Sequence, residues 1–172
     1  VLFDLSSTEQ TNRQALIFPD HEGFNEKFKF YDGFSIYIKY KPTSDATQQV
    51  LFWMDQLLVE YVPSENKLRL NGDYQNTTDN ATSSNLNKIT TNSGWNIDTT
   101  NELLLQFHNS SIQVYIDGVL DTDISLNAIS GSTTTWEAIE VGSLYFGNSR
   151  HNRDTGHERG FQGYIENITI YD

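Results

Sequence analysis

The chain has 172 residues, enough for one domain with a full core, and it contains no stretch of about 18 apolar residues that could cross a membrane. It has no cysteine, which excludes disulfides, thiolate zinc sites and cysteine nucleophiles. Its net charge of −12 argues against nucleic acid, because binding a phosphate backbone depends on Lys and Arg displacing condensed counterions. We therefore expect a single domain over residues 1–172 that neither inserts into a membrane nor binds nucleic acid.

Apolar residues alternate with period two wherever they are dense, which indicates β-strands with one buried face. In the segment 34–40, every second residue from Phe34 to Tyr40 is Phe, Ile or Tyr, and the residues between them are Ser, Tyr and Lys. The segment 111–116 alternates in the same way. The other predicted strands are bounded by Gly, Asn, Asp, Ser and Thr clusters and cover 2–5, 14–18, 49–54, 57–62, 67–71, 102–108, 119–125, 139–146 and 161–171. A set of about ten to twelve short strands predicts two sheets packed face to face.

Turn signals and long polar segments separate the predicted strands. Asp117-Gly118 is the strongest hairpin signal, because both residues tolerate positive φ. The two weaker turn signals are Asp32-Gly33 and Asn71-Gly72. The polar segments that lack a strand pattern are 72–101, 126–138 and 147–160. Long loops in a compact domain often carry function, so we expect a binding site on the rim that these three segments form.

Several segments carry a family resemblance. In chain order they are FSIYIKYKP at 34–42, QVLFWMDQLLVEYV at 49–62, KLRLNG at 67–72, VYIDG at 114–118, LYFGN at 144–148 and GFQGYIENITIYD at 160–172, the last of which breaks its alternation once. These segments resemble the strands of laminin-G-like and concanavalin A-like jelly-roll domains. The resemblance covers about residues 34–172 and implies an all-β fold, a two-sheet antiparallel β-sandwich of the jelly-roll type. The chain departs from animal laminin-G domains at Tyr164, where those domains usually carry a disulfide cysteine.

The resemblance implies recognition rather than catalysis, because members of this superfamily bind ligands more often than they catalyse reactions. The expected partner is a glycan or a cell-surface or matrix protein, met outside the cell in an adhesion or lectin-like role. One alternative is a protein-interaction or structural module of an adhesin or receptor. Another is an accessory domain of a carbohydrate-active enzyme, or such an enzyme itself. Four glycosylation sequons suit an extracellular protein, although chance explains them almost as well: Asn76, Asn80, Asn109 and Asn167.

Catalysis is not expected from the carboxylates of the chain. Jelly-roll glycoside hydrolases place an acid and a nucleophile on one strand face, and their E-x-D-x-x-E run is absent. The nearest approach is Glu137 with Glu140, and an offset of three places these residues on opposite faces of a strand.

Calcium is the cofactor that the resemblance implies. A rim calcium in laminin-G-like domains uses an acid between two early strands and an Asn or Asp in a late loop, which correspond to Asp55 and Asn148. The alternative is that Asp55 only turns the chain between two strands. Other relatives hold a calcium where the termini meet, which would use Asp172 or Asp4.

Aromatic and basic loop residues are the candidate ligand contacts. Trp95 and Trp136 lie among amides and hydroxyls and could stack on a sugar, or else cover the open end of the sandwich as plugs. Trp53, in the LFWM run, is expected in the core. The basic loop candidates for an acidic glycan are Arg150, His151 and Arg153. The alternative is that neighbouring acids in 147–160 neutralise them.

Overall fold

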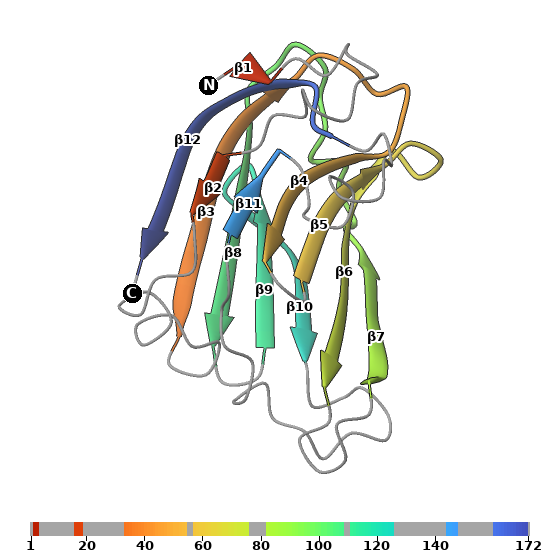
Figure 1. Ribbon diagram of the computed structural model, residues 1–172, viewed down its shortest axis with the longest axis vertical. Helices are drawn as coiled ribbons and strands as arrows, with labels where there is room; N and C mark the ends of the chain where they lie inside the picture. Colours follow the sequence, from red (N-terminus) through yellow and green to blue (C-terminus); the bar gives the residue numbers. More distant parts are fainter. Residues whose placement is uncertain are drawn as a thin grey trace.

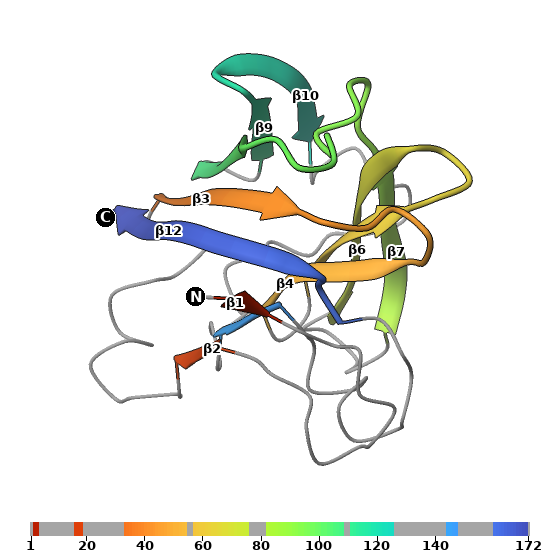
Figure 2. The same cartoon turned by 90° about the horizontal axis from the view of Figure 1, so that it is seen from above.

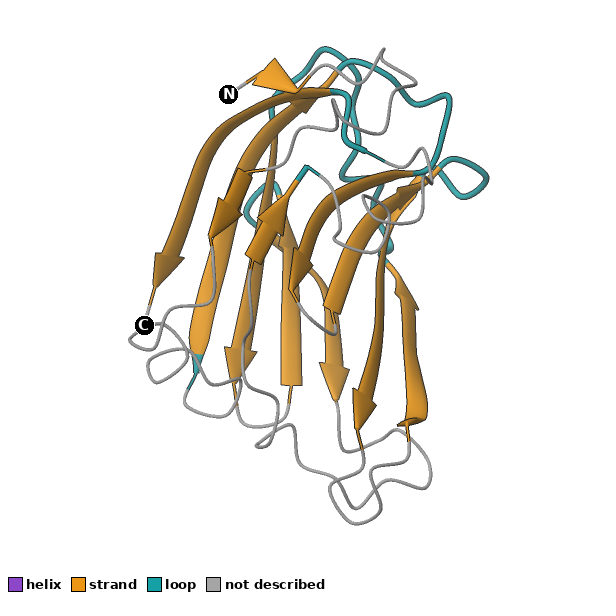
Figure 3. Ribbon diagram, viewed as in Figure 1, coloured by secondary structure: helices purple, strands orange, loops and turns teal. Residues whose placement is uncertain are grey.

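The computed structural model describes residues 2–3, 16–18, 33–54, 57–75, 82–108, 111–125, 144–147 and 160–171. Every regular element in this part of the chain is a β-strand, and the twelve strands form two six-stranded sheets (Figures 1 and 3). Neighbouring strands within each sheet are antiparallel. The all-β, two-sheet jelly-roll prediction is confirmed.

The first sheet brings together strands from both ends of the chain with a hairpin from its middle. Its order is β1 (Leu2–Phe3), β12 (Gly163–Tyr171), β3 (Phe34–Pro42), β8 (Asn101–His108), β9 (Ser111–Ile116) and β10 (Val119–Ser125). Figure 2 shows β3 and β12 side by side, with β9 and β10 at the far end of the same layer. The last strand therefore lies against an early one, which closes the sandwich.

The second sheet faces the first and has an equally non-sequential order. It runs β2 (Leu16–Phe18), β11 (Leu144–Phe146), β4 (Gln49–Met54), β5 (Leu57–Val62), β6 (Lys67–Gln75) and β7 (Thr82–Ile89). The strands β4 to β7 are consecutive in sequence, whereas β11 inserts between β2 and β4. Long-range pairing of this kind cannot be inferred from local sequence patterns.

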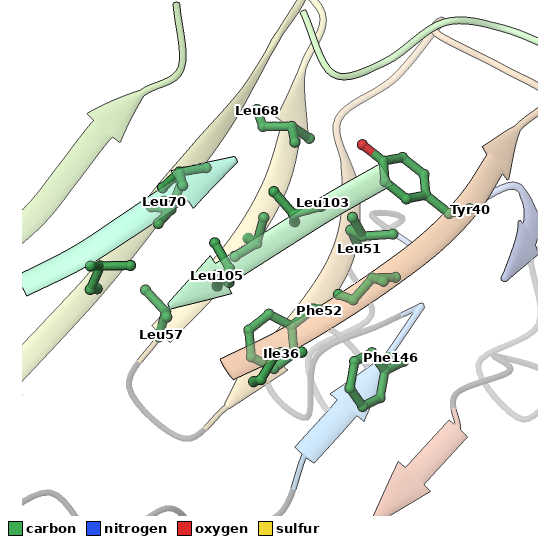
Figure 4. Close-up of a cluster of buried hydrophobic side chains, with 14 of the residues drawn as sticks. Ile36, Tyr40, Leu51, Phe52, Leu57, Leu68, Leu70, Leu103, Leu105 and Phe146 are labelled. Atoms are coloured by element: carbon green, nitrogen blue, oxygen red, sulfur yellow. The ribbon is translucent and has the colours of Figure 1, made fainter. Parts of the chain in front are cut away.

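The core lies between the sheets and is built by the alternation of each strand. On β3, the even-numbered positions from Phe34 to Tyr40 are buried and the odd positions are partly exposed. β8 and β9 show the same alternation. Figure 4 shows the inward side chains of both sheets meeting: Ile36, Tyr40, Leu51, Phe52, Leu57, Leu68, Leu70, Leu103, Leu105 and Phe146. Burial of these side chains is the main source of stability.

The predicted loop 72–101 is wrong over much of its length. β6 continues to Gln75, and 82–89 forms β7, an edge strand of the second sheet. The turn signal Asn71-Gly72 is wrong for the same reason, since both residues lie inside β6 and pair with β5 and β7. The sequence does not predict β7, because a polar edge strand lacks the apolar alternation that identifies a half-buried strand.

Trp53 is also misplaced by the sequence prediction. It is only partly buried and lies outside the central core cluster. It pairs in register with Tyr145 of β11, and the two rings lie 5.0 Å apart on the outer face of the second sheet. The residues around Trp53 are apolar on both faces of β4, so no alternation in the sequence shows that Trp53 lies on the outer face.

Two local irregularities are confirmed. Asp117 and Gly118 have φ angles of 49° and 78°, as a tight hairpin between β9 and β10 requires. The break in the closing strand is a register shift between Ile165 and Asn167 in the pairing of β12 with β3. At the start of β12, Gly163 has a φ of 147°, and a Cβ there would lie 2.2 Å from the carbonyl oxygen of Lys41. Only glycine fits this position.

Candidate functional site

Most of the residues predicted for a rim site lie outside the described residues. They are Trp136, Arg150, His151, Arg153, Asp55 and Asn148. The ligand-binding and calcium roles assigned to them stay predictions. Among the described residues, no group of three or more His, Asp or Glu side chains is placed to hold a metal ion, and no helix long and apolar enough to cross a membrane occurs.

Trp95 is a core residue, and the prediction that it stacks on a sugar is corrected. Its side chain is 2% exposed, and its ring stacks on Tyr61 at 4.6 Å with an interplanar angle of 9°. Its ring lies perpendicular to that of Phe161 at a centroid distance of 5.6 Å, and its Nε1–H donates to the carbonyl oxygen of Ser44 at 3.0 Å. Neighbouring groups therefore occupy the surfaces that a ligand would need. The alternative interpretation, a plug over the end of the sandwich, is the one that the geometry supports.

The outer face of the first sheet offers a different site. The odd-numbered residues of β3 point away from the core, as do the even-numbered residues of β8 and the odd-numbered residues of β9. In the register of the sheet, Tyr37 lies opposite Leu104, and Leu104 lies opposite Tyr115. Two tyrosines thus flank one leucine across three adjacent strands, about 9 to 10 Å apart, which is twice the strand spacing.

Polar side chains occupy the next row of the same face. Ser35 lies opposite Gln106, which lies opposite Gln113, and Gln113 lies opposite Asp123 of β10. At the other end of this row, Tyr171 of β12 lies opposite Ser35 and is 53% exposed. Amide, hydroxyl and carboxylate groups therefore adjoin the aromatic row directly.

A charged row borders the aromatic row on its other side. Lys39 lies opposite Glu102, and Lys39 Nζ is 3.9 Å from Glu102 Oε1. Both side chains are about two fifths exposed, so the ion pair contributes little to stability. Its position beside Tyr37 matters more, because it brings a carboxylate to the edge of the aromatic surface.

Two hollows are cut into this face, each with a volume of about 370 Å³. The first, here called the tyrosine hollow, is lined by Tyr37, Glu102, Leu104, Gln106, Tyr115 and Gly118. The second, here called the histidine hollow, is lined by Gly33, Phe34, Ser35, Gln106, Phe107, His108, Gln113 and Tyr171. Gln106 lines both, so the hollows adjoin. Volumes of this size lie at the lower end of the range for ligand pockets.

Hydrogen bonds fix part of the lining and leave part of it open. The hydroxyl of Tyr115 donates to Gln113 Oε1 at 3.2 Å, and Gln113 Nε2 donates to Asp123 Oδ2 at 3.2 Å. The amide of Gln113 therefore has a set orientation. The amide of Gln106 makes no hydrogen bond with the part of the chain that the structure describes. Within that part of the chain, its carbonyl oxygen and its two amide hydrogens have no partner.

The phenol of Tyr37 is held in its protonated form. Partial burial raises the pKa of Tyr37, and the negative charge of Glu102 and a hydrogen bond to that carboxylate raise it further. Because the phenol hydrogen is donated to Glu102, the phenol oxygen and the carboxylate present acceptors side by side. These acceptors suit hydroxyl groups that donate.

Sequence reasoning missed this site, although its signal was present. The alternation already placed Tyr37 on the polar face of 34–40 and Tyr115 on the polar face of 111–116. A tyrosine on a polar strand face is a candidate contact residue. Its significance depends on which strands are neighbours, and the pairing of β3, β8 and β9 appears only in the folded structure.

The two antiparallel sheets and their strand order form a jelly-roll β-sandwich, the fold that the resemblance to laminin-G-like and concanavalin A-like domains implied. No protein-family model matches the chain, and no curated protein matches its sequence. Its likeness to known proteins is therefore one of structure.

Solved structures with this fold cover most of the chain. A galectin of Caenorhabditis elegans, LEC-6, matches at a TM-score of 0.54 and 11% identity, over 93% of this chain and 92% of the galectin. Mouse laminin α1 domains LG4-5 match at a TM-score of 0.60 and 14% identity, over 91% of this chain and 37% of that structure. The CBM40 domain of the Ruminococcus gnavus IT-sialidase, solved with α2,3 sialyllactose, matches at a TM-score of 0.53 and 16% identity, over 81% of this chain and 75% of that structure. At these identities the likeness establishes the fold alone.

Proposed function

We propose that the chain is a non-catalytic recognition domain that binds a glycan through the outer face of its first sheet. The observation that carries this proposal is the pair of adjoining hollows, with Tyr37 and Tyr115 in one and Gln106 lining both. Sugars present flat, C–H-rich faces and hydroxyl-rich edges. An aromatic row bordered by amides and carboxylates complements both.

The structural neighbours are consistent with this class of partner. A galectin and a CBM40 domain bound to α2,3 sialyllactose share the fold. A cell-surface or secreted location follows from the same proposal. The rim residues Asp55 and Asn148 stay proposed calcium ligands, and Trp136, Arg150, His151 and Arg153 stay proposed contacts at a second, rim site.

A glycan array read with substituted proteins tests the proposal. Tyr37→Ala and Tyr115→Ala are each expected to lower binding at least tenfold, because a large stacking surface is lost. Tyr164→Ala is the matched control, since Tyr164 is an exposed tyrosine of the same sheet that lines neither hollow. Binding that Tyr164→Ala weakens as much as Tyr37→Ala, or no binding to any glycan, contradicts the proposal. Running the array with calcium and with EDTA tests the metal.

A protein partner is the second candidate, favoured by the edge of the same sheet. Val119 is 63% exposed and Leu120 is 48% exposed, and both lie on β10, the last strand of the first sheet. An edge strand offers unpaired backbone groups to a partner segment, and exposed apolar side chains add contact area. Loss of partner capture by Val119→Ser with unchanged glycan binding would distinguish this function from the first.

A further inference from the structure

The charges around the two hollows indicate the charge of the ligand that this face would bind. Three carboxylates border the hollows: Glu102 lines the tyrosine hollow, Asp123 bonds Gln113, and Glu166 acts electrostatically on Tyr37. Lys39, the cation of β3 next to the row of Tyr37, is already paired with Glu102. Among the described residues, no Arg or Lys side chain lines either hollow. The local potential is therefore negative, in keeping with the net charge of −12.

A negative site discriminates against negative ligands. A sialylated or sulfated sugar placed here meets like charges and no described cation that could form a bidentate pair. An uncharged sugar is not repelled, and its hydroxyls can donate hydrogen bonds to the carboxylates of Glu102 and Asp123. Hydrogen bonds to ionised acceptors are stronger than those between neutral groups.

Gln106 relates the two hollows to each other. It lies on β8, the strand between Tyr37 and Tyr115, and it lines both hollows. Its amide is uncommitted within the described residues, whereas the amide of its cross-strand neighbour Gln113 is held by Tyr115 and Asp123. A ligand that fills both hollows must pass over Gln106 and can receive hydrogen bonds from it on both sides.

We propose that this face binds an uncharged oligosaccharide of at least two sugar rings, one in each hollow, with the Gln106 amide hydrogen-bonded at the junction between the rings. The inference rests on the proposed glycan-binding function and assigns its ligand class. The acidic-glycan contacts proposed for Arg150, His151 and Arg153 belong to the separate rim site and are not involved.

The test compares neutral oligosaccharides with their charged counterparts. Wild-type protein is measured against neutral di- to hexasaccharides, the sialylated and sulfated forms of the same compounds, and the free monosaccharides. The neutral oligosaccharide is expected to bind at least tenfold more tightly than its anionic counterpart at low salt, and the difference should shrink at high salt. Equal or tighter binding of the anionic forms that is lost in Tyr37→Ala and Tyr115→Ala overturns the inference.

Substitutions at Gln106 test the junction. Gln106→Ala is expected to weaken oligosaccharide binding about tenfold and monosaccharide binding much less, because only the longer ligand reaches the junction. Thr99→Ala, an exposed change near the opposite end of β8, is the control. Equal losses for both ligand lengths, or none, overturn the junction.

The two proposals fail in different ways. If no glycan binds, or if binding ignores Tyr37 and Tyr115, the proposed function is wrong and the inference falls with it. If binding depends on both tyrosines but favours anionic sugars or monosaccharides, the function stands and the ligand class is wrong.

Discussion

The two sheets carry similar polar and aromatic residues on their outer faces but use them differently. On the second sheet, Glu60 points away from the core and is nevertheless fully buried, with its carboxylate bound by Arg69 Nε at 2.8 Å and by Gln48. On the first sheet, Gln106 also points away from the core, but its amide has no partner among the described residues. The comparison teaches that a polar side chain on a strand supports the fold where it is paired and buried, and is free for a ligand where it is not.

The largest expected effect comes from removing the ion pair between Arg69 and Glu60 on the second sheet. Arg69→Met leaves the carboxylate of Glu60 buried without its guanidinium partner, which should lower the free energy of unfolding by about 3 kcal/mol. Urea unfolding monitored by tryptophan fluorescence measures the change. Lys67→Met, on the same face of β6 but outside this ion pair, is the control and should change the value by about 0.5 kcal/mol or less. Equal effects of the two substitutions would show that the ion pair is not the cause.

An intermediate effect is expected at Asp121, which is partly exposed but paired. It sits at a register shift of β10, and its carboxylate accepts from the backbone amides of Thr91 at 2.7 Å and Asn92 at 2.6 Å. Partial burial raises its pKa, but the hydrogen bonds from Thr122, Asn92 and Thr91 outweigh this and hold the pKa below its ordinary value. Asp121→Ala should cost about 1 kcal/mol at neutral pH, because it removes the tie between the edges of the two sheets.

The pH dependence of this loss has a definite sign. Because the folded-state pKa of Asp121 is lowered, its carboxylate contributes stability above the ordinary carboxyl pKa of about 3.9. That contribution disappears as the pH falls through the lowered value. The difference between wild type and Asp121→Ala in urea unfolding should therefore shrink from pH 7 towards about pH 3. A difference that stays constant would contradict the ionised hydrogen bonds as its source.

The smallest expected effect on stability is at Gln106 of the first sheet, whose amide has no partner among the described residues. Gln106→Ala should change the free energy of unfolding by about 0.5 kcal/mol or less, since no hydrogen bond to a described residue is lost. Thermal melting in the absence of ligand measures this. A loss comparable to that of Arg69→Met would mean that Gln106 supports the fold and would remove the contrast between the two faces.

Much of the architecture follows from local patterns. The alternation in 34–40 and 111–116 reports which side chains are buried, and Asp117-Gly118 and the break in 161–171 report local backbone geometry. The failures share one cause. β7 has no apolar alternation because it is a polar edge strand. Trp53 is only partly buried and Trp95 is a core residue, the reverse of the prediction, because hydrophobicity does not reveal which face of a sheet is covered.

The sequence by itself determined the fold class, the strand faces and the strongest turn, because each depends on residues close together along the chain. Only the tertiary structure decided which strands became neighbours, which polar groups found partners, and where the hollows lie. The face that carries Tyr37, Gln106 and Tyr115 exists because β3, β8 and β9 pair, and Gln106 and Gln113 face each other across one strand boundary. Such contacts depend on strand order, which long-range packing selects and no local pattern encodes.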